Sequence, residues 1–224
     1  RHKHRQMTKR QIQEHLKSDP HSGNDGAWLR DLILGGQDGL VNVLGLVLGV
    51  AIATNDARLV IVSGLAALFA EGISMGAVAY TSTKAAVEFY ERERAREYNE
   101  IDTLPDAEKE EVRKIYQQKG FRGKMLEMIV QKITQNKNRW VNVMMEEELR
   151  LFKEKESPLR SGLIVGIAAH VGAVFPLIPF LLLPIDSAKI VVLPFSLLVL
   201  FVAGAIKGRF TRVTRWKSGL ELAV

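Results

Sequence analysis

An acidic side chain, Asp38, lies inside an apolar, glycine-rich stretch that is long enough to cross a lipid bilayer. The stretch covers residues 31–54 and begins DLILGGQDGLVNVLG. About 20 apolar residues span the hydrocarbon core, and a charge at that depth costs from about 2.5 to more than 10 kcal/mol. We therefore expect Asp38 to lie on the path of an ion or proton. The alternative is that headgroups solvate Asp38 near the membrane face.

Four apolar segments predict transmembrane helices. We expect them at about 30–54, 59–83, 158–183 and 188–206. Pro176 and Pro179 should kink the third span, and residues 184–187 should form the turn before the fourth. The sequence thus predicts an all-α, multi-pass membrane protein.

A charged segment between the second and third spans predicts an inserted helical domain. We expect three helices there, at about 84–101, 104–118 and 121–156, with a break in the last near residues 136–138. Thr103 can cap the second of these helices, and Pro105 suits its first turn. In the third helix, an apolar residue recurs every fourth position and predicts one buried stripe, formed by Phe121, Met125, Ile129 and Ile133.

The distribution of charge divides the chain and predicts its orientation. The segments are a basic tail (1–29), two spans (30–84), the insert (85–157), two further spans (158–207) and the expected start of a fifth span (208–224). Lys and Arg gather in the tail, in the insert and after residue 206, so the positive-inside rule places these parts in the cytosol. A net charge of +6 gathered beside apolar runs does not indicate nucleic-acid binding, and the lack of cysteine excludes disulfides.

Further polar residues inside the predicted spans suggest a shared site. Asn42 lies one helical turn after Asp38, and Met75 lies one turn after Glu71. If the first two spans pack together, these side chains converge. Carboxylates bind divalent cations and protons, and a thioether shifts the preference toward late first-row metals. The alternative is a protonated, hydrogen-bonded Glu71 with Met75 as packing. His170 in the third span is either a proton relay or a hydrogen-bonding partner between helices.

The insert carries acidic pairs at helical spacing. Two pairs are spaced i, i+3, and a third group combines two methionines with a glutamate, so each group shares one helix face: Glu97 and Glu100, Glu108 and Glu111, and Met144, Met145 and Glu148. Three helices could gather these carboxylates and thioethers around metal ions. Glutamates at this spacing are also common on solvated helices. No Glu-x-x-His pair occurs in the chain, which disfavours a di-iron enzyme.

The chain resembles the vacuolar iron transporter family, the ferrous iron and manganese carriers of plants, fungi and many prokaryotes. The resemblance extends over residues 28–216 and rests on RDLILGGQDGLVNVLG, EGISMGAVAY, LPDAEKEEVRKIYQQKG and VMMEEEL. The pattern DGLVNVLGL is more similar to prokaryotic members. The resemblance implies a vacuolar membrane location for a eukaryotic protein and a cell membrane location for a prokaryotic one.

The resemblance also implies a mechanism and a set of site residues. Family members generally have five spans, and Fe²⁺ leaves the cytosol in exchange for protons through a homodimer. Asp38, Glu71 and Met75 match the translocation residues. The metal-binding domain of the family is matched by Glu97, Glu100, Glu108, Glu111, Met144, Met145 and Glu148.

Our main hypothesis is a proton-coupled exporter of Fe²⁺, and of Mn²⁺ as a second substrate, with Co²⁺ and Zn²⁺ as further metals to test. The expected partners are divalent metal ions, protons, membrane lipids and a second copy of the chain, and we expect no prosthetic group. The alternative is a membrane-anchored iron-binding buffer or sensor that does not transport.

Overall fold

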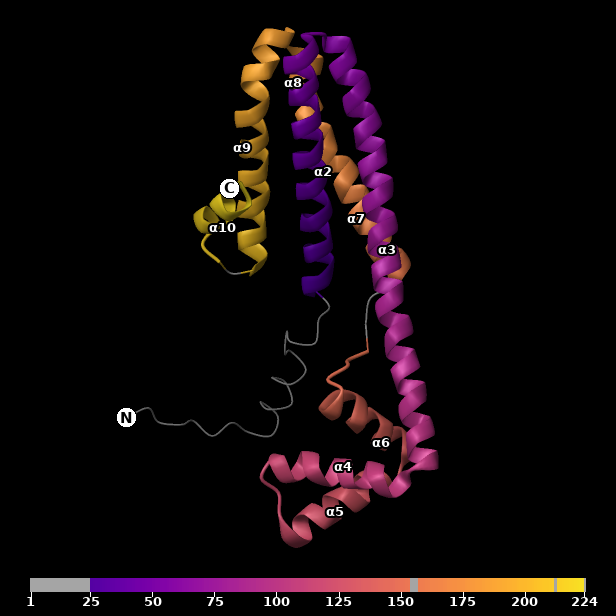
Figure 1. The fold of residues 1–224 in the computed structure, drawn as a ribbon. Coiled ribbons are helices and arrows are strands. Elements are labelled where there is room, and N and C mark those ends of the chain that lie inside the picture. Colours follow the sequence, from indigo (N-terminus) through magenta and orange to yellow (C-terminus); the bar gives the residue numbers. More distant parts are fainter. Residues whose placement is uncertain (1–24, 154–156, 212, 224) are drawn as a thin grey trace, which may run out of the picture. The chain divides into compact units, whose positions relative to one another are not determined.

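The structure is a computed structural model that describes residues 25–153, 157–211 and 213–223. Within these residues every regular element is helical (Figure 1). Four of the helices described there are long and apolar enough to cross a membrane, and they coincide with the four predicted spans: Trp28–Thr54, Ala57–Thr103, Pro158–Leu182 and Ile185–Thr211. The all-α, multi-pass prediction is confirmed.

The chain forms two compact units. The membrane unit contains the described residues up to Ser74 together with those from Ile164 onward, and the insert unit is Met75–Leu163. Helix α3 (Ala57–Thr103) contributes to both. Its 47 residues extend about 70 Å at 1.5 Å per residue, more than twice the roughly 30 Å hydrocarbon core. The charged part of α3 after Lys84 therefore lies outside the bilayer.

A capped turn joins the first two membrane helices. Helix α2 (Asp25–Thr54) ends before Asn55, whose φ of 50° is left-handed. The Asp56 side chain then caps α3, since its Oδ1 accepts hydrogen bonds from the backbone N–H groups of Arg58 at 2.8 Å and Leu59 at 3.3 Å. Lys189 donates a 2.7 Å hydrogen bond to Asn55 Oδ1. The hairpin is thereby attached to the beginning of the fourth span.

The third span is bent at its prolines, as predicted. Helix α7 (Pro158–Val174) passes into the 3₁₀ turn η3 (Phe175–Leu177) and then into α8 (Ile178–Leu182). Helix α9 (Ile185–Thr211) follows, and α10 (Arg215–Ala223) folds back onto it. The turn predicted at residues 184–187 is wrong for its last three residues. Asp186 lies instead in the first turn of α9, where a negative charge is favourable.

Glycines allow the backbones of α2 and α7 to touch. A Cβ atom at Gly39 would lie 2.2 Å from the carbonyl oxygen of Ala169, and one at Gly172 would lie 2.0 Å from that of Gly36. These separations are too short for any side chain, so the two helices meet only because glycine occupies these positions. Beyond this contact, all four spans of the membrane unit share one apolar core, which includes Val43, Val47, Ala51, Val60, Leu68, Ala173, Leu177, Phe180, Ala188 and Val192.

The insert unit packs short helices around a second apolar core. The end of α3 is followed by α4 (Pro105–Gln118), α5 (Gly123–Thr134), α6 (Lys137–Val143) and the π-helix η2 (Met144–Glu148). The break expected near residue 136 is confirmed, and Asn136 caps α6 by accepting a 2.9 Å hydrogen bond from the Arg139 N–H. Core residues come from each element: Ile101, Val112, Leu126, Val130, Ile133, Trp140, Val141, Met144 and Met145.

Two local predictions for the insert are wrong. Thr103 does not cap α4, because its hydroxyl donates a 2.8 Å hydrogen bond to the Asn99 carbonyl within α3. The N-cap is Leu104, without a side-chain hydrogen bond, although Pro105 does occupy the first turn. The third helix also ends early, since the last helical residue before the third span in the described segment up to residue 153 is Glu148. Residues 154–156 of its predicted range lie outside the described residues.

The buried stripe of α5 differs from the predicted one. Met125 is exposed, whereas Leu126, Val130 and Ile133 are buried. A strict spacing of four residues advances about 400° per step on a helix with 3.6 residues per turn, so it drifts by about 40° at each step. The predicted line of residues therefore meets the core only in part: Ile133 is buried, Phe121 and Ile129 pack against the core, and the prediction is wrong for Met125.

Candidate functional site

The membrane unit brings together polar side chains from its first two helices. Asn42 on α2 donates a 3.0 Å hydrogen bond to Glu71 Oε1 on α3. Asp38, one turn earlier on α2, lies close to the same carboxyl group. Two ionised carboxylates repel each other and only accept hydrogen bonds, so a proton or a cation between them would stabilise the pair.

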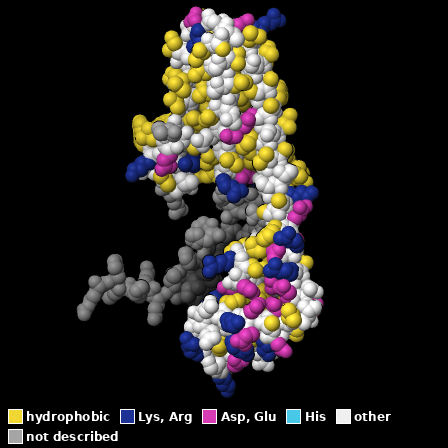
Figure 2. Space-filling model, viewed as in Figure 1, with side chains coloured by type: hydrophobic (Ala, Val, Ile, Leu, Met, Phe, Trp, Pro, Cys, Tyr) yellow, Lys and Arg dark blue, Asp and Glu magenta, His cyan; other side chains and the backbone are white. Residues whose placement is uncertain are grey.

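This polar group opens outward from the membrane unit. Asn42 is exposed, and Asp38 and Glu71 are half-buried. Figure 2 shows acidic atoms among the hydrophobic side chains of this unit. Further along α2, a Cβ atom at Gly45 or Gly49 would meet no atom within 4 Å. The face of α2 that carries Asn42 therefore continues past Gly45 and Gly49 with nothing packed on these two glycines.

Two further predicted residues lie on neighbouring positions of these helices. Met75 is half-buried and lies one turn after Glu71 along α3. His170 on α7 packs against α3 where Gly72 leaves room, since a Cβ there would lie 1.8 Å from His170 Nδ1. That nitrogen is 2.8 Å from the Gly166 carbonyl oxygen. The ring is therefore oriented by its own helix, and the proton-relay role stays a prediction.

The predicted carboxylates of the insert unit gather between α3, α4 and η2. Glu97 on α3 is only 2% exposed and Glu108 on α4 only 5%. The Oε2 atoms of both are buried without a hydrogen-bond partner. Unpartnered buried carboxylate oxygens are costly, so a bound proton or cation would stabilise these atoms.

The thioethers of η2 lie in the same core. Met144 and Met145 are fully buried, and η2 contacts α4. The π-helical turn is closed by a 3.1 Å hydrogen bond from the Leu149 N–H to the Met144 carbonyl. Such turns are frequent at functional sites. In the part of the chain that the structure describes, no three Asp, Glu or His side chains are arranged to hold a metal ion, so the acids are gathered without a formed coordination shell.

One guanidinium serves several of these acids. Arg96 Nη1 is 2.7 Å from Glu93 Oε2, and its other nitrogens are 3.6 Å from Glu100 Oε1 and 3.8 Å from Glu97 Oε1. Sequence reasoning missed both Arg96 and the buried Glu93. The available signal was the position of Glu93 and Glu100 three and four residues from Arg96, where side chains meet on one helix face.

Burial and mutual repulsion make the cluster bind protons more tightly. Burial, and then the nearby charges of Glu100 and Glu148, raise the pKa of Glu97 to about 7. Burial, followed by the charges of Glu111 and Glu97, raises the pKa of Glu108 to about 7. The pKa of Glu148 is also raised, by partial burial of its carboxylate and then by Glu111 and Glu100. Glu97 and Glu108 therefore exchange protons readily near neutral pH.

A protein with several membrane-spanning helices, carboxyl groups within them and buried acids outside them has the features of an ion transporter. The VIT family model matches residues 29–224. The chain is 35% identical over 201 residues to vacuolar iron transporter 2 of Oryza sativa subsp. japonica, an alignment covering 89% of this chain and 82% of that protein.

Two other relatives extend the comparison. Vacuolar iron transporter 1 of Arabidopsis thaliana is 33% identical over 200 residues, which is 88% of this chain and 80% of that protein. The vacuolar iron transporter of Plasmodium berghei (strain Anka) is 32% identical over 206 residues, or 87% and 76% of the two chains. The chain belongs to the VIT family. It is an integral, multi-pass membrane transporter and not an enzyme.

The raised pKa of Glu108 predicts a pH-dependent stability of the insert. Between its ordinary pKa of 4.5 and the folded value of about 7, the native state holds a proton that the unfolded chain has released. The contribution to the free energy of unfolding is complete below pH 4.5 and is lost as pH rises through about 7. In the metal-free protein, hydrogen exchange of α4 should show protection falling by on the order of 1 kcal/mol or more over this range.

Glu108→Gln should remove this part of the pH dependence, since the amide does not titrate. Glu110→Gln is the control, because Glu110 lies on the same helix but is exposed and paired with Arg113. The same pH profile in both variants would show that the buried carboxyl group of Glu108 does not hold the proton.

Proposed function

We propose that this metal-ion transporter of the VIT family moves Fe²⁺, and Mn²⁺ as a second substrate, out of the cytosol in exchange for protons. The observation that carries the proposal is the Asn42–Glu71 hydrogen bond with Asp38 beside it, on two membrane-capable helices. The names of the relatives as iron transporters support iron as the substrate.

The chemistry of the pair favours exchange of a metal ion for protons. A cation between Asp38 and Glu71 would take the place of a proton between them, because metal ligands must be deprotonated. The same oxygens therefore hold either a metal ion or protons. Met75, one turn further along α3, would add a thioether and favour Fe²⁺ over Ca²⁺ and Mg²⁺. Asn42 supplies an amide oxygen if its hydrogen bond to Glu71 gives way.

The acidic cluster of the insert would collect the ion before transport. A divalent cation would satisfy the buried Oε2 atoms of Glu97 and Glu108, and it would draw in Glu100, Glu111 and Glu148 against their mutual repulsion. The thioethers of Met144 and Met145 would complete a mixed oxygen and sulfur site. Lys and Arg concentrate in the insert and after the fourth span, which supports a cytosolic location for this cluster.

A homodimer would cover the open face of α2. Carboxyl groups facing lipid are costly, and the exposed side of Asn42 continues into Gly45 and Gly49 with nothing packed on them. Two such faces could approach closely. Because the chain has no cysteine, Gly49→Cys should form an intermolecular disulfide in membranes, visible on a non-reducing gel. Leu198→Cys on the exposed side of α9 should not, and equal cross-linking of both would place the contact elsewhere.

Metal flux tests the role of the membrane carboxyl groups. In proteoliposomes with a pH gradient, Asp38→Asn and Glu71→Gln should each slow Fe²⁺ uptake by roughly tenfold or more, a change of about 1.4 kcal/mol. Uptake and its coupled proton movement are read with a metal-sensitive and a pH-sensitive dye. Asp186→Asn, an exposed acid in the first turn of α9, is the control. Full uptake in the Asp38 and Glu71 variants would reject the proposed path.

The second candidate is a membrane-anchored metal buffer or sensor, which the compact insert unit with its own acidic cluster favours. Both candidates predict metal binding by the cluster. In the detergent-purified full chain, Glu97→Gln combined with Glu108→Gln should weaken Co²⁺ binding at least about tenfold by calorimetry, while Glu110→Gln should not. Binding without any flux in the wild-type protein would favour the buffer, and unaltered binding in the double variant would place the metal site outside the cluster.

A further inference from the structure

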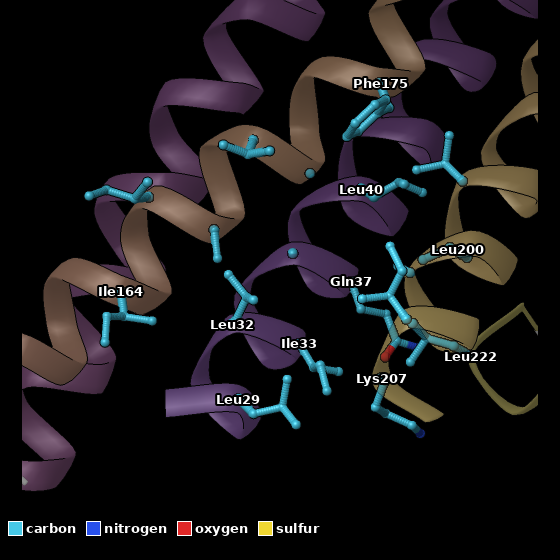
Figure 3. A pocket seen from close by; sticks show the side chains of 18 of the residues that line it. Leu29, Leu32, Ile33, Gln37, Leu40, Ile164, Phe175, Leu200, Lys207 and Leu222 are labelled. Atoms are coloured by element: carbon cyan, nitrogen blue, oxygen red, sulfur yellow. The ribbon is translucent and has the colours of Figure 1, made fainter. Parts of the chain in front are cut away.

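A groove opens between α2, α7, α9 and α10 of the membrane unit, away from the Asn42–Glu71 pair. Its volume is about 470 Å³ (Figure 3), within the range of small-molecule sites. Its walls are aliphatic and aromatic, and polar atoms come from the side chains of Trp28, Gln37 and Lys207. Figure 3 shows Lys207 at the same end as Leu29 and Ile33, with Leu40 and Phe175 at the other end. The groove therefore has one charged end and one apolar end.

The length of the groove matches one leaflet of a bilayer. On α2 it extends from Trp28 to Leu40, and on α9 from Phe210 back to Val199. At 1.5 Å per residue these stretches are about 18 Å and 17 Å long, slightly more than half of the roughly 30 Å hydrocarbon core. Trp28 and Phe210 meet edge to face at the charged end, with ring centroids 6.1 Å apart. Aromatic residues, and Trp above all, mark the level of the headgroups.

Lys207 carries the charge at this end. Its side chain is 23% exposed, and its Nζ lies 3.6 Å from Glu221 Oε2 on α10. That distance is longer than a hydrogen bond, and an ammonium group has three donors. Arg209, Arg215 and Lys217 follow in the sequence after this end of the groove, so the local charge is positive overall.

We propose that the groove binds an anionic phospholipid, with one acyl chain between α2 and α9 and the phosphate at Lys207. The apolar walls suit the chain, and the cation suits the phosphate. Basic pockets between transmembrane helices on the cytoplasmic side are known lipid-headgroup sites. The assignment to the cytosolic leaflet rests on the orientation proposed above. The groove and its charge do not depend on metal transport.

Competition between two lipids tests the proposal. Native mass spectrometry of the purified full chain with equal amounts of phosphatidylglycerol and phosphatidylcholine should show preferential retention of phosphatidylglycerol. Lys207→Gln should lower the ratio of the two bound lipids by about fivefold. Arg209→Gln removes the same charge two residues further on, outside the lining of the groove, and should leave the ratio near that of the wild type. Glu221→Gln should raise the ratio, because it removes a negative charge beside Lys207.

A second variant tests the groove itself. Ala203 lines the groove from α9, and Ala203→Phe should reduce the retention of both lipids by filling the space. Equal effects of Lys207→Gln and Arg209→Gln would show that the preference for phosphatidylglycerol comes from general surface charge. That result would overturn the proposal. Unchanged lipid retention in Ala203→Phe would show that no chain enters the groove. Glu221 is exposed, so the Glu221→Gln variant should fold and still tests the proposal if a groove variant unfolds.

Discussion

The structure depends on carboxyl groups that have too few hydrogen-bond partners for their positions in the fold. In the membrane unit, Asp38 and Glu71 lie close together in helices that cross an apolar medium, and the amide of Asn42 donates a hydrogen bond to Glu71. In the insert unit, Glu97 and Glu108 each bury an oxygen that has no hydrogen-bond partner. Folding free energy gains nothing from either arrangement. Both arrangements are understandable in a protein whose work is to hold a cation briefly and release it.

The acidic cluster of the insert and the Asp38–Glu71 pair lie in different surroundings, and they therefore suit different roles. The insert cluster contains Arg96, which offsets part of its charge, and several acids whose pKa values are raised toward neutrality. In the proposed function, such a site would take up a metal ion near neutral pH while releasing protons. The membrane pair contains fewer groups, so a metal ion there would be held by fewer ligands and leave more easily. Transfer from a larger set of ligands to a smaller one suits a carrier.

The sequence predicted what depends on composition along the chain. The spans follow from apolar length and the kink from Pro176 and Pro179, and the meeting of Asn42 and Glu71 was predicted on the condition that the first two spans pack together. The other features of the structure depend on how the helices pack. In α5 the core face includes the predicted Ile133 together with Leu126 and Val130, and it leaves the predicted Met125 exposed.

Two further features depend on contacts between elements far apart in the sequence, or on backbone geometry, and single-sequence patterns do not reveal them. They are the π-helix at Met144 and the groove beside Lys207. Thr103 shows the same limit at short range. Its hydroxyl donates a hydrogen bond to the Asn99 carbonyl in the preceding helix α3 and does not cap α4.

The backbone contact between α2 and α7 constrains how such a carrier can move. Gly36 and Gly39 leave no clearance against Gly172 and Ala169, so sliding one helix along the other would drive a carbonyl oxygen into a Cα. The two helices must then shift as one rigid body. Alternating exposure of Asp38 to the two sides of the membrane would have to arise at its other boundary, where α2 meets α3 through a hydrogen bond that can be exchanged.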